Sequence, residues 1–302
     1  MNRQPRRLLV TADDFGIGPE TTRGILELGA MGAITSTVML VNSPYAEEAV
    51  AQWKRTHSTL EIGWHPCLTM DRPVLSAEQV PSLVDVQGKF YSLGKFLFRL
   101  MRGYVRDTEL YAELSAQYRR YVDLMGTVPL NVNGHHHVHI FGPVRRALLE
   151  LMQHQYPLPY LRRVQEPWRT LWSVPGIRLK RCLLSSMGSR SAFEQAKAEY
   201  PGAEWLLGIT DPPYFEANDF FIRWLNKAPG AVVELMCHPV HDDVTLLGRD
   251  ATPANGQRER RVHEWYRLLS PGFLEAVRAN GFEMVRAGEL VQVDHSREQR
   301  AA

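Results

Sequence analysis

The sequence predicts a single-domain α/β protein, built as a distorted (β/α) TIM-like barrel. Three observations support this prediction. Short apolar runs alternate with helical patterns about seven times along the 302 residues, and such repeated units imply a parallel sheet with helices outside it. This number of units favours a barrel over an open sheet. No change in composition is strong enough to split the chain, so one domain should cover 1–302, with a core of about 6–292 and a disordered C-terminal tail.

The first half of the chain shows the alternation most clearly. Short runs rich in apolar and β-branched residues predict strands at 7–12, 35–41 and 60–65. Apolar residues at helical spacing predict helices at 19–32, 44–56 and 107–125. Between them, 66–89 holds several prolines and no clear period, which indicates a long loop with functional potential.

The second half continues the pattern with shorter elements. Strands are expected at 130–134, 160–164, 205–209, 231–237 and 282–285. Helices are expected at 143–154, 216–225, 259–269 and 272–280. The later strands are again apolar, as strands buried on both faces of a parallel sheet must be.

Composition narrows the classes of protein to which the chain could belong. The net charge of +2 gives no reason to expect a nucleic-acid partner, and the Arg-rich patches at 3–7 and 258–261 are expected to be solvated faces. No apolar run reaches the ~18 residues that a transmembrane helix needs, and the apolar run at 8–10 is too short for a signal peptide. Three widely spaced cysteines do not suggest a disulfide framework, so a cytoplasmic location is expected.

The segment His135-His136-His137-Val138-His139 places four histidines in five positions between two apolar segments. If the segment is extended, Asn133, His135, His137 and His139 share one face. A single buried histidine is common in a protein core, but three imidazoles on one face are hard to satisfy without water or a metal ion. The run therefore predicts a metal or acid–base site at a strand end.

Polar residues also follow other predicted strands. Asp13 and Asp14 end the first strand, His65 ends the third, and His238 follows a late one. Barrel active sites gather at the carboxyl ends of the strands, so these side chains should meet there. Adjacent carboxylates repel each other unless a positive charge lies nearby, and a divalent cation would supply it; a helix N-cap is the alternative role for the pair. One Asp and two His from separate strands form an open metal-ligand set.

Six sequence blocks, in their order and spacing, resemble the YdjC-like carbohydrate deacetylases (ChbG/HpnK group). The blocks are TADDFG at 11–16, ITST with VN at 34–42, GWH with LT at 63–69, PSLVD at 81–85, HHHVH at 135–139 and ELMCHP at 234–239. The resemblance covers most of the chain. Any single block would be weak, but the set is specific.

The resemblance implies a distorted barrel that hydrolyses the N-acetyl group of an amino sugar, carried by an oligosaccharide or a glycolipid. The metal ligands of the family correspond to Asp14, His65 and His135, and its base corresponds to Asp13. The cofactor expected from this set is a divalent cation, Mg²⁺ or Zn²⁺.

Further roles are expected around this set. His238 is the first candidate for the general acid that protonates the departing amine, and His139 is the second. His139, Asn133, Trp64 and Tyr214 are expected to contact substrate. Three positions depart from the family pattern: Trp64 and Pro66 each stand where a small apolar residue is common, and Asn133 replaces a frequent aspartate.

Two other classes of function could use a similar set of residues. A metal-dependent phosphodiesterase or sugar isomerase would use a similar set, but these usually need more carboxylates or cationic phosphate clamps, and no Arg or Lys stands among the predicted strand-end residues. A non-catalytic metal- or carbohydrate-binding protein would need a closed four-ligand metal site, to which Cys67 and Cys237 could contribute. A homodimer is left open.

Overall fold

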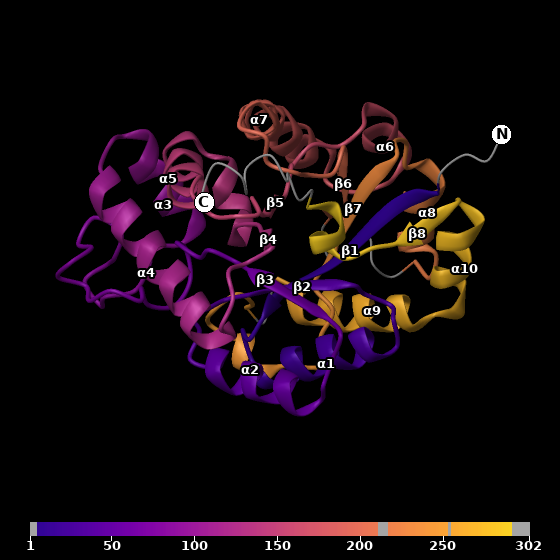
Figure 1. The fold of residues 1–302 in the computed structure, drawn as a ribbon, viewed down its shortest axis with the longest axis horizontal. Coiled ribbons are helices and arrows are strands. Elements are labelled where there is room, and N and C mark those ends of the chain that lie inside the picture. The colour runs from indigo at the N-terminus through magenta and orange to yellow at the C-terminus, as the bar shows by residue number, and fades with distance from the viewer. Residues whose placement is uncertain (1–4, 211–216, 253–254, 292–302) are drawn as a thin grey trace.

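The computed structural model describes residues 5–210, 217–252 and 255–291, so Tyr214 and the C-terminal tail lie outside the described residues. A parallel sheet curls into a half-barrel with helices around it in a single domain, which confirms the predicted distorted barrel (Figure 1). Seven strands follow the order β5-β4-β3-β2-β1-β7-β6, and β8 pairs with β1. The strands are β1 (Arg6–Phe15), β2 (Ser36–Met39), β3 (Glu61–Trp64), β4 (Asn131–Val132), β5 (Tyr160–Leu161), β6 (Trp205–Leu207), β7 (Val232–Cys237) and β8 (Phe282–Met284).

Strand β1 is the centre of the sheet. Its last eight residues are all buried, as expected for a strand covered on both faces. It pairs with β7 along one edge, while β8 and then β2 share the other edge. The carboxyl end of β1 therefore lies between β2 and β7, at the middle of the half-barrel.

The opening of the half-barrel lies between β5 and β6. These two strands do not pair, but two backbone hydrogen bonds cross the gap. The Leu206 N–H donates to the Gln165 carbonyl at 2.9 Å, and the Leu161 N–H donates to the Pro201 carbonyl at 2.8 Å. The sheet is thus bent far enough to bring its two ends together without forming a regular closed barrel.

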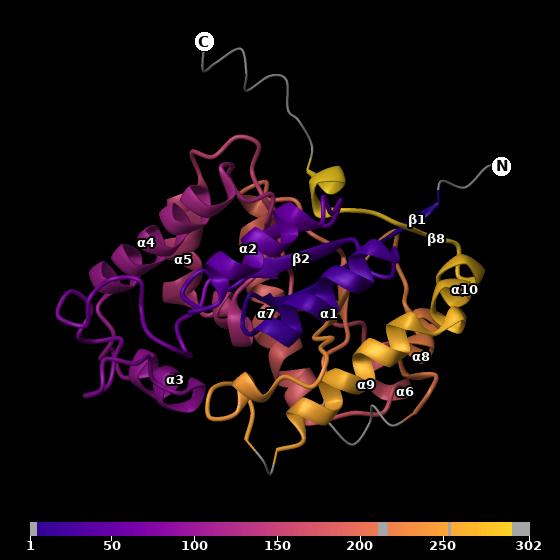
Figure 2. The ribbon, with the colours of Figure 1, turned by 90° about the horizontal axis from the view of Figure 1, so that it is seen from below.

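The helices surround the sheet, and α1, α2 and α9 lie side by side along one side of it (Figures 1 and 2). They are α1 (Pro19–Ala30), α2 (Ala46–Arg55), α3 (Leu93–Met101), α4 (Asp107–Met125), α5 (Gly142–Met152), α6 (Trp168–Ser173), α7 (Arg178–Lys197), α8 (Phe220–Lys227), α9 (Gln257–Leu269) and α10 (Pro271–Ala279). None of the described helices combines the length and the apolar character needed to cross a membrane.

Helices α3, α6 and α7 were not expected from the sequence. Helix α6 has only six residues, too few to show a period. Helix α7 buries polar side chains such as Arg181 and Gln195 and exposes apolar ones, so it has no inward apolar stripe to detect. The long helix α4 was predicted with its observed limits, since Gly126 follows it in the left-handed conformation that ends many helices (φ 75°).

Candidate metal and catalytic site

The carboxyl ends of the strands surround a cavity of about 360 Å³. Its wall includes Asp13 and Asp14 from β1, His65 after β3, His135 after β4 and His238 after β7. The structure thus brings together these five residues, which the sequence had placed at separate strand ends. Parallel strands deliver their carboxyl ends to one edge of the sheet, and this is the physical reason for the convergence.

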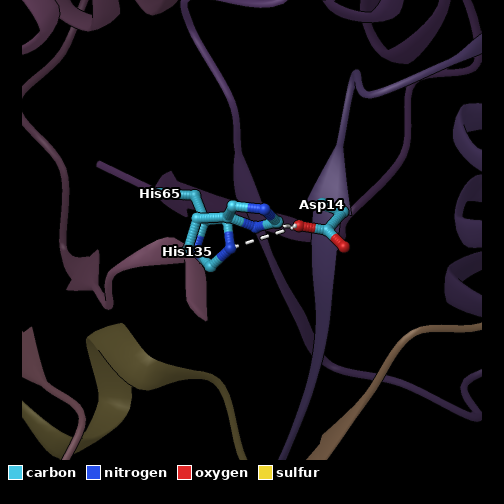
Figure 3. Close-up of side chains that lie close together, drawn as sticks. All are labelled: Asp14, His65 and His135. Atoms are coloured by element: carbon cyan, nitrogen blue, oxygen red, sulfur yellow. Dashed lines mark hydrogen bonds and ion pairs between the residues drawn. The ribbon is translucent and has the colours of Figure 1, made fainter. Parts of the chain in front are cut away.

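The imidazoles of His65 and His135 lie together on one side of Asp14 and approach the same carboxylate oxygen (Figure 3). Its Oδ1 is 2.9 Å from His135 Nδ1 and 3.3 Å from His65 Nε2. The other His65 nitrogen, Nδ1, lies 2.9 Å from the Asn133 carbonyl oxygen, which can only accept a hydrogen bond. If that nitrogen carries the proton of a neutral imidazole, Nε2 turns a lone pair toward the carboxylate, and the two repel unless a proton or a cation joins them.

His135 also favours a positive charge at this point. Burial alone would lower the pKa of His135, but the Asp14 carboxylate outweighs it and raises this pKa well above the ordinary value. Its Nε2 is buried and lies 3.6 Å from Asp250 Oδ1, too far for a hydrogen bond. A carboxylate, two imidazoles and an unsatisfied nitrogen within reach of one another fit a divalent cation, and Asp14, His65 and His135 could hold one.

The backbone at Asp14 explains how two neighbouring aspartates reach one cavity. Successive side chains of a regular strand point to opposite faces. Asp14 instead adopts φ 69°, a left-handed conformation that costs an ordinary residue about 1–2 kcal/mol, at a register irregularity between Ala12 and Phe15. The alternative N-cap role is wrong, because the N-cap of α1 is Gly18 and the carboxylate that accepts from the first turn, at the Thr21 N–H, belongs to Asp243.

Asp13 is held by Arg162, a residue that the sequence reasoning missed. The Arg162 guanidinium donates to both Asp13 oxygens at 2.6 and 2.8 Å and to Glu234 at 2.8 Å, and all three side chains are buried. Burial alone would raise the pKa of Asp13, but Arg162 overcomes this effect and the pKa falls to about 2. Asp13 therefore remains a carboxylate at neutral pH.

Arg162 also corrects the premise that no Arg or Lys stands at a strand end, since it directly follows β5. A second correction concerns Arg261, which was expected on a solvated face. It is buried on α9, donates to Asp14 Oδ2 at 2.7 Å and pairs with Asp250. Charged residues in a helix pattern are usually exposed, so the sequence carried no local sign of this role.

The histidine run is not extended. Strand β4 ends at Val132, and His135–Ile140 forms a 3-10 helix in which His136 (φ 52°) and His137 (φ 56°) are left-handed. The predicted alternation of faces is therefore wrong. The chain must turn from β4 into α5 within a few residues, and a straight strand cannot make this turn.

The turn sends each imidazole in a different direction. His136 Nδ1 lies 2.9 Å from the Thr69 hydroxyl oxygen, and His136 Nε2 lies 3.3 Å from Asp250 Oδ1. His135, His136 and Asp250 thus form a second group able to hold a metal ion. His137 lines the cavity. His139 accepts a hydrogen bond from the Gly134 N–H at 2.9 Å, and this bond closes the turn.

Three of the four residues expected to contact substrate lie elsewhere. His139 is buried behind the turn with its Nε2 3.2 Å from the Arg162 carbonyl, so it does not face the cavity as a general acid or a substrate ligand. Trp64 is fully buried and packs edge-on against Tyr118 in the core. Asn133 is also buried. Its Nδ2 lies 3.5 Å from Asp13 Oδ1, so it contacts a residue of the site and does not line the cavity. The fourth, Tyr214, is outside the described residues.

His238 faces the cavity with its Nε2 3.9 Å from Asp13 Oδ2. Burial, followed by the charges of Arg260 and Arg261, lowers the pKa of His238 to about 3. The imidazole is therefore neutral at neutral pH, and it must first receive a proton before it can deliver one.

Known proteins are similar to this chain over most of its length. Residues 7–279 match the family described as YdjC-like protein. The chain is 41% identical over 301 residues to a carbohydrate deacetylase of Mus musculus, with 94% of each chain covered. It is 31% identical over 249 residues to a chitooligosaccharide deacetylase of Klebsiella pneumoniae, covering 80% of this chain and 85% of the other. A solved structure from Enterococcus faecalis, titled as a cellobiose-phosphate cleavage protein, covers 96% of this chain and 100% of its own at a TM-score of 0.74 and 26% identity.

Proposed function

This chain belongs to the YdjC-like protein family, and from that membership we propose a metal-dependent hydrolase that removes the acetyl group from an N-acetylated amino sugar. The curated relatives are carbohydrate deacetylases, which hydrolyse amide bonds. The observation that carries the proposal is the cavity where Asp14, His65 and His135 converge beside Asp13 and His238. It combines a candidate cation site with two groups that can move a proton.

Asp14, His65 and His135 would hold the cation, with the imidazoles suited to Zn²⁺ and the set compatible with Mg²⁺. When bound, a divalent cation polarises an amide carbonyl and lowers the pKa of water from ~16 toward ~7 in favourable zinc cases. Arg261 holds Asp14 Oδ2 at 2.7 Å, which leaves Oδ1 directed at the two imidazoles. Arg261 is thus a positioning residue for the ligand set.

Asp13 receives the proton of the attacking water while the water oxygen adds to the carbonyl carbon. Two hydrogen bonds from Arg162 fix the orientation of the carboxylate and keep it ionised. The proton passes to His238, whose Nε2 lies 3.9 Å from Asp13 Oδ2. His238 delivers this proton to the amide nitrogen as the C–N bond breaks, which gives acetate and a free amino sugar.

The competing functions lose support. Arg162 and Arg261 are each held by two carboxylates, and Arg260 of the cavity wall pairs with Glu264, so these three arginines are not available as a phosphate clamp. Lys180 is the remaining cationic residue among those that line the cavity. Cys67 and Cys237 are buried and free, and the groups of described residues able to hold a metal contain no thiolate. A closed structural metal site is therefore not favoured.

Acetate release is the first measurement. Metal-loaded protein should release acetate from N-acetylglucosamine oligosaccharides or from lipids that carry this sugar. The cavity contains the groups that hydrolysis of the amide bond in the acetamido group requires. His135→Ala, which removes a ligand, should be inactive with its circular dichroism unchanged. If a broad panel of such glycans and glycolipids yields no acetate, the proposed substrate class is wrong.

Metal affinity should depend on pH. The pKa of His135 is raised above its ordinary value, so a proton competes with the cation below that raised value. Zn²⁺ affinity should therefore rise about tenfold per pH unit on the acid side, since each binding event releases one proton from His135. Calorimetric titrations at several pH values would measure this slope.

The matched control is His57→Ala, which removes an exposed histidine and should leave the slope unchanged. A Zn²⁺ affinity that is flat across the acid range would contradict proton release from His135.

A further inference from the structure

Two surface patches beside the cavity expose large apolar side chains, which are not expected on a surface that faces only water. The α3 patch consists of Phe98, Met101 and Tyr104. The α6–α7 patch consists of Trp168, Trp172, Leu179, Leu183 and Phe193. Met101 is 80% exposed and Leu179 is 84% exposed, so they do not contribute to the core. Exposed apolar clusters of this kind often mark a surface that binds another protein or a membrane.

The α6–α7 patch is an ordered feature of the helix. Leu179, Leu183 and Phe193 are spaced by four and ten residues, so they lie along one outer face of α7. The opposite face buries Arg181, whose guanidinium is bound to Glu166. Helix α7 therefore turns three large apolar side chains to the outside, although Leu184 and Met187 pack against the core, and this outer apolar row indicates a partner.

Both patches adjoin the cavity. Leu93 of α3 and Lys180 and Leu184 of α7 belong to the cavity wall, together with the catalytic residues. In both views α7 lies between α3 and α6 (Figures 1 and 2). A flat partner that covered both patches would lie across the entrance to the cavity.

Charge identifies the partner. Residues 93–104 and 168–193 contain seven Lys or Arg residues that are exposed or half-buried, and no Asp or Glu, although the whole chain is almost balanced. One of the seven, Arg190, pairs with the neighbouring Glu194. Arg169 and Arg178 lie over the rings of Trp168 and Trp172, at 5.5 and 5.8 Å from their centroids. Exposed tryptophans and leucines among basic residues are typical of protein surfaces that enter the interface of an anionic bilayer.

Two other occupants fit less well. A second copy of the chain, related by a two-fold axis, would bring the same basic residues against each other. A glycan would stack on the faces of aromatic rings, but Met101, Leu179 and Leu183 offer no such faces. A hydrocarbon layer with anionic head groups satisfies both the aliphatic side chains and the positive charge.

We propose that the α3 and α6–α7 patches dock this protein on an anionic lipid bilayer, with the cavity opening at the membrane surface. Docking itself does not depend on catalysis. Resting on the proposed function, it further implies that the acetamido sugar can be presented as the head group of a membrane lipid.

The test is co-sedimentation with vesicles of phosphatidylcholine alone and of phosphatidylcholine mixed with phosphatidylglycerol. The chain should bind the mixed vesicles, release them at high salt and bind the neutral ones weakly. Trp168→Ser/Trp172→Ser/Leu183→Ser and, separately, Phe98→Ser/Met101→Ser should each weaken binding by about tenfold or more. Met31→Ser is the matched control, since Met31 is 59% exposed outside both patches.

Acetate release from a soluble N-acetylated oligosaccharide should be the same in the patch variants and the parent, so a failure of docking and a failure of the deacetylase proposal are distinguishable. Unchanged vesicle binding by both patch variants overturns the proposal. A parent that does not bind vesicles overturns it too, and a dimer in analytical ultracentrifugation that the patch substitutions dissociate would then assign the patches to a second copy.

Discussion

Asp13→Asn should lower kcat by roughly 10²–10⁴ while the protein still binds its cation, because the substitution keeps the shape of the side chain and removes only the proton acceptor. The cavity geometry supports this separation of roles: Asp13 faces Arg162 and His238, while Asp14 faces His65 and His135. Steady-state kinetics with elemental analysis of the same preparation measure both quantities.

Asp14→Asn should fail in the other way. It removes the carboxylate that both imidazoles share, so metal affinity should fall first and excess metal should restore part of the activity. Asp123→Asn is the control, because Asp123 is exposed on α4 and should affect neither quantity. Reversed phenotypes would mean that the two aspartates have exchanged roles, and two fully active variants would remove both from the mechanism.

Arg162→Met should reduce the free energy of unfolding by about 3–5 kcal/mol at neutral pH, since breaking a buried ion pair leaves uncompensated buried charge. In this protein the substitution leaves two carboxylates, Asp13 and Glu234, without the guanidinium that binds both. Urea denaturation followed by tryptophan fluorescence measures the loss. The control is Arg169→Met, which removes an exposed arginine.

The loss should shrink as the pH falls. In the parent, the pKa of Asp13 is lowered to about 2, so its contribution to stability is present above the ordinary value of 3.8 and is lost only as the pH falls toward 2. In the variant, the main effect that opposes burial is gone and the pKa of Asp13 rises, so the folded state takes up a proton and recovers stability on the acid side. The two proteins should therefore differ less at a pH of about 4 than at neutral pH.

Replacing all three charges, in Asp13→Asn/Arg162→Met/Glu234→Gln, should recover part of the stability because no buried charge is left unpaired. A loss that is the same at both pH values, or a triple variant less stable than Arg162→Met, would show that Arg162 contributes through packing rather than through charge.

The order and type of the main elements follow from the sequence alone, because apolar periodicity and strand-forming runs are local properties. Helix α4 was predicted with its observed limits, and so were strands at the places of β1, which carries Asp13 and Asp14, and of β3, β4 and β7, which precede His65, His135 and His238. Parallel strands in a barrel must bring their carboxyl ends together, so the convergence of these five residues on one cavity was also predictable.

The tertiary structure decided what local pattern cannot encode. The left-handed turns at Asp14, His136 and His137 depend on how the chain leaves β1 and β4, and they determine which cavity-side atoms meet. Arg162 and Arg261 look like ordinary exposed arginines in the sequence. In the fold they are buried, pair with Asp13 and Asp14, and keep these two carboxylates ionised. Ion pairs between residues more than a hundred positions apart form only when the sheet curls. A local sequence pattern spans too few residues to include both partners.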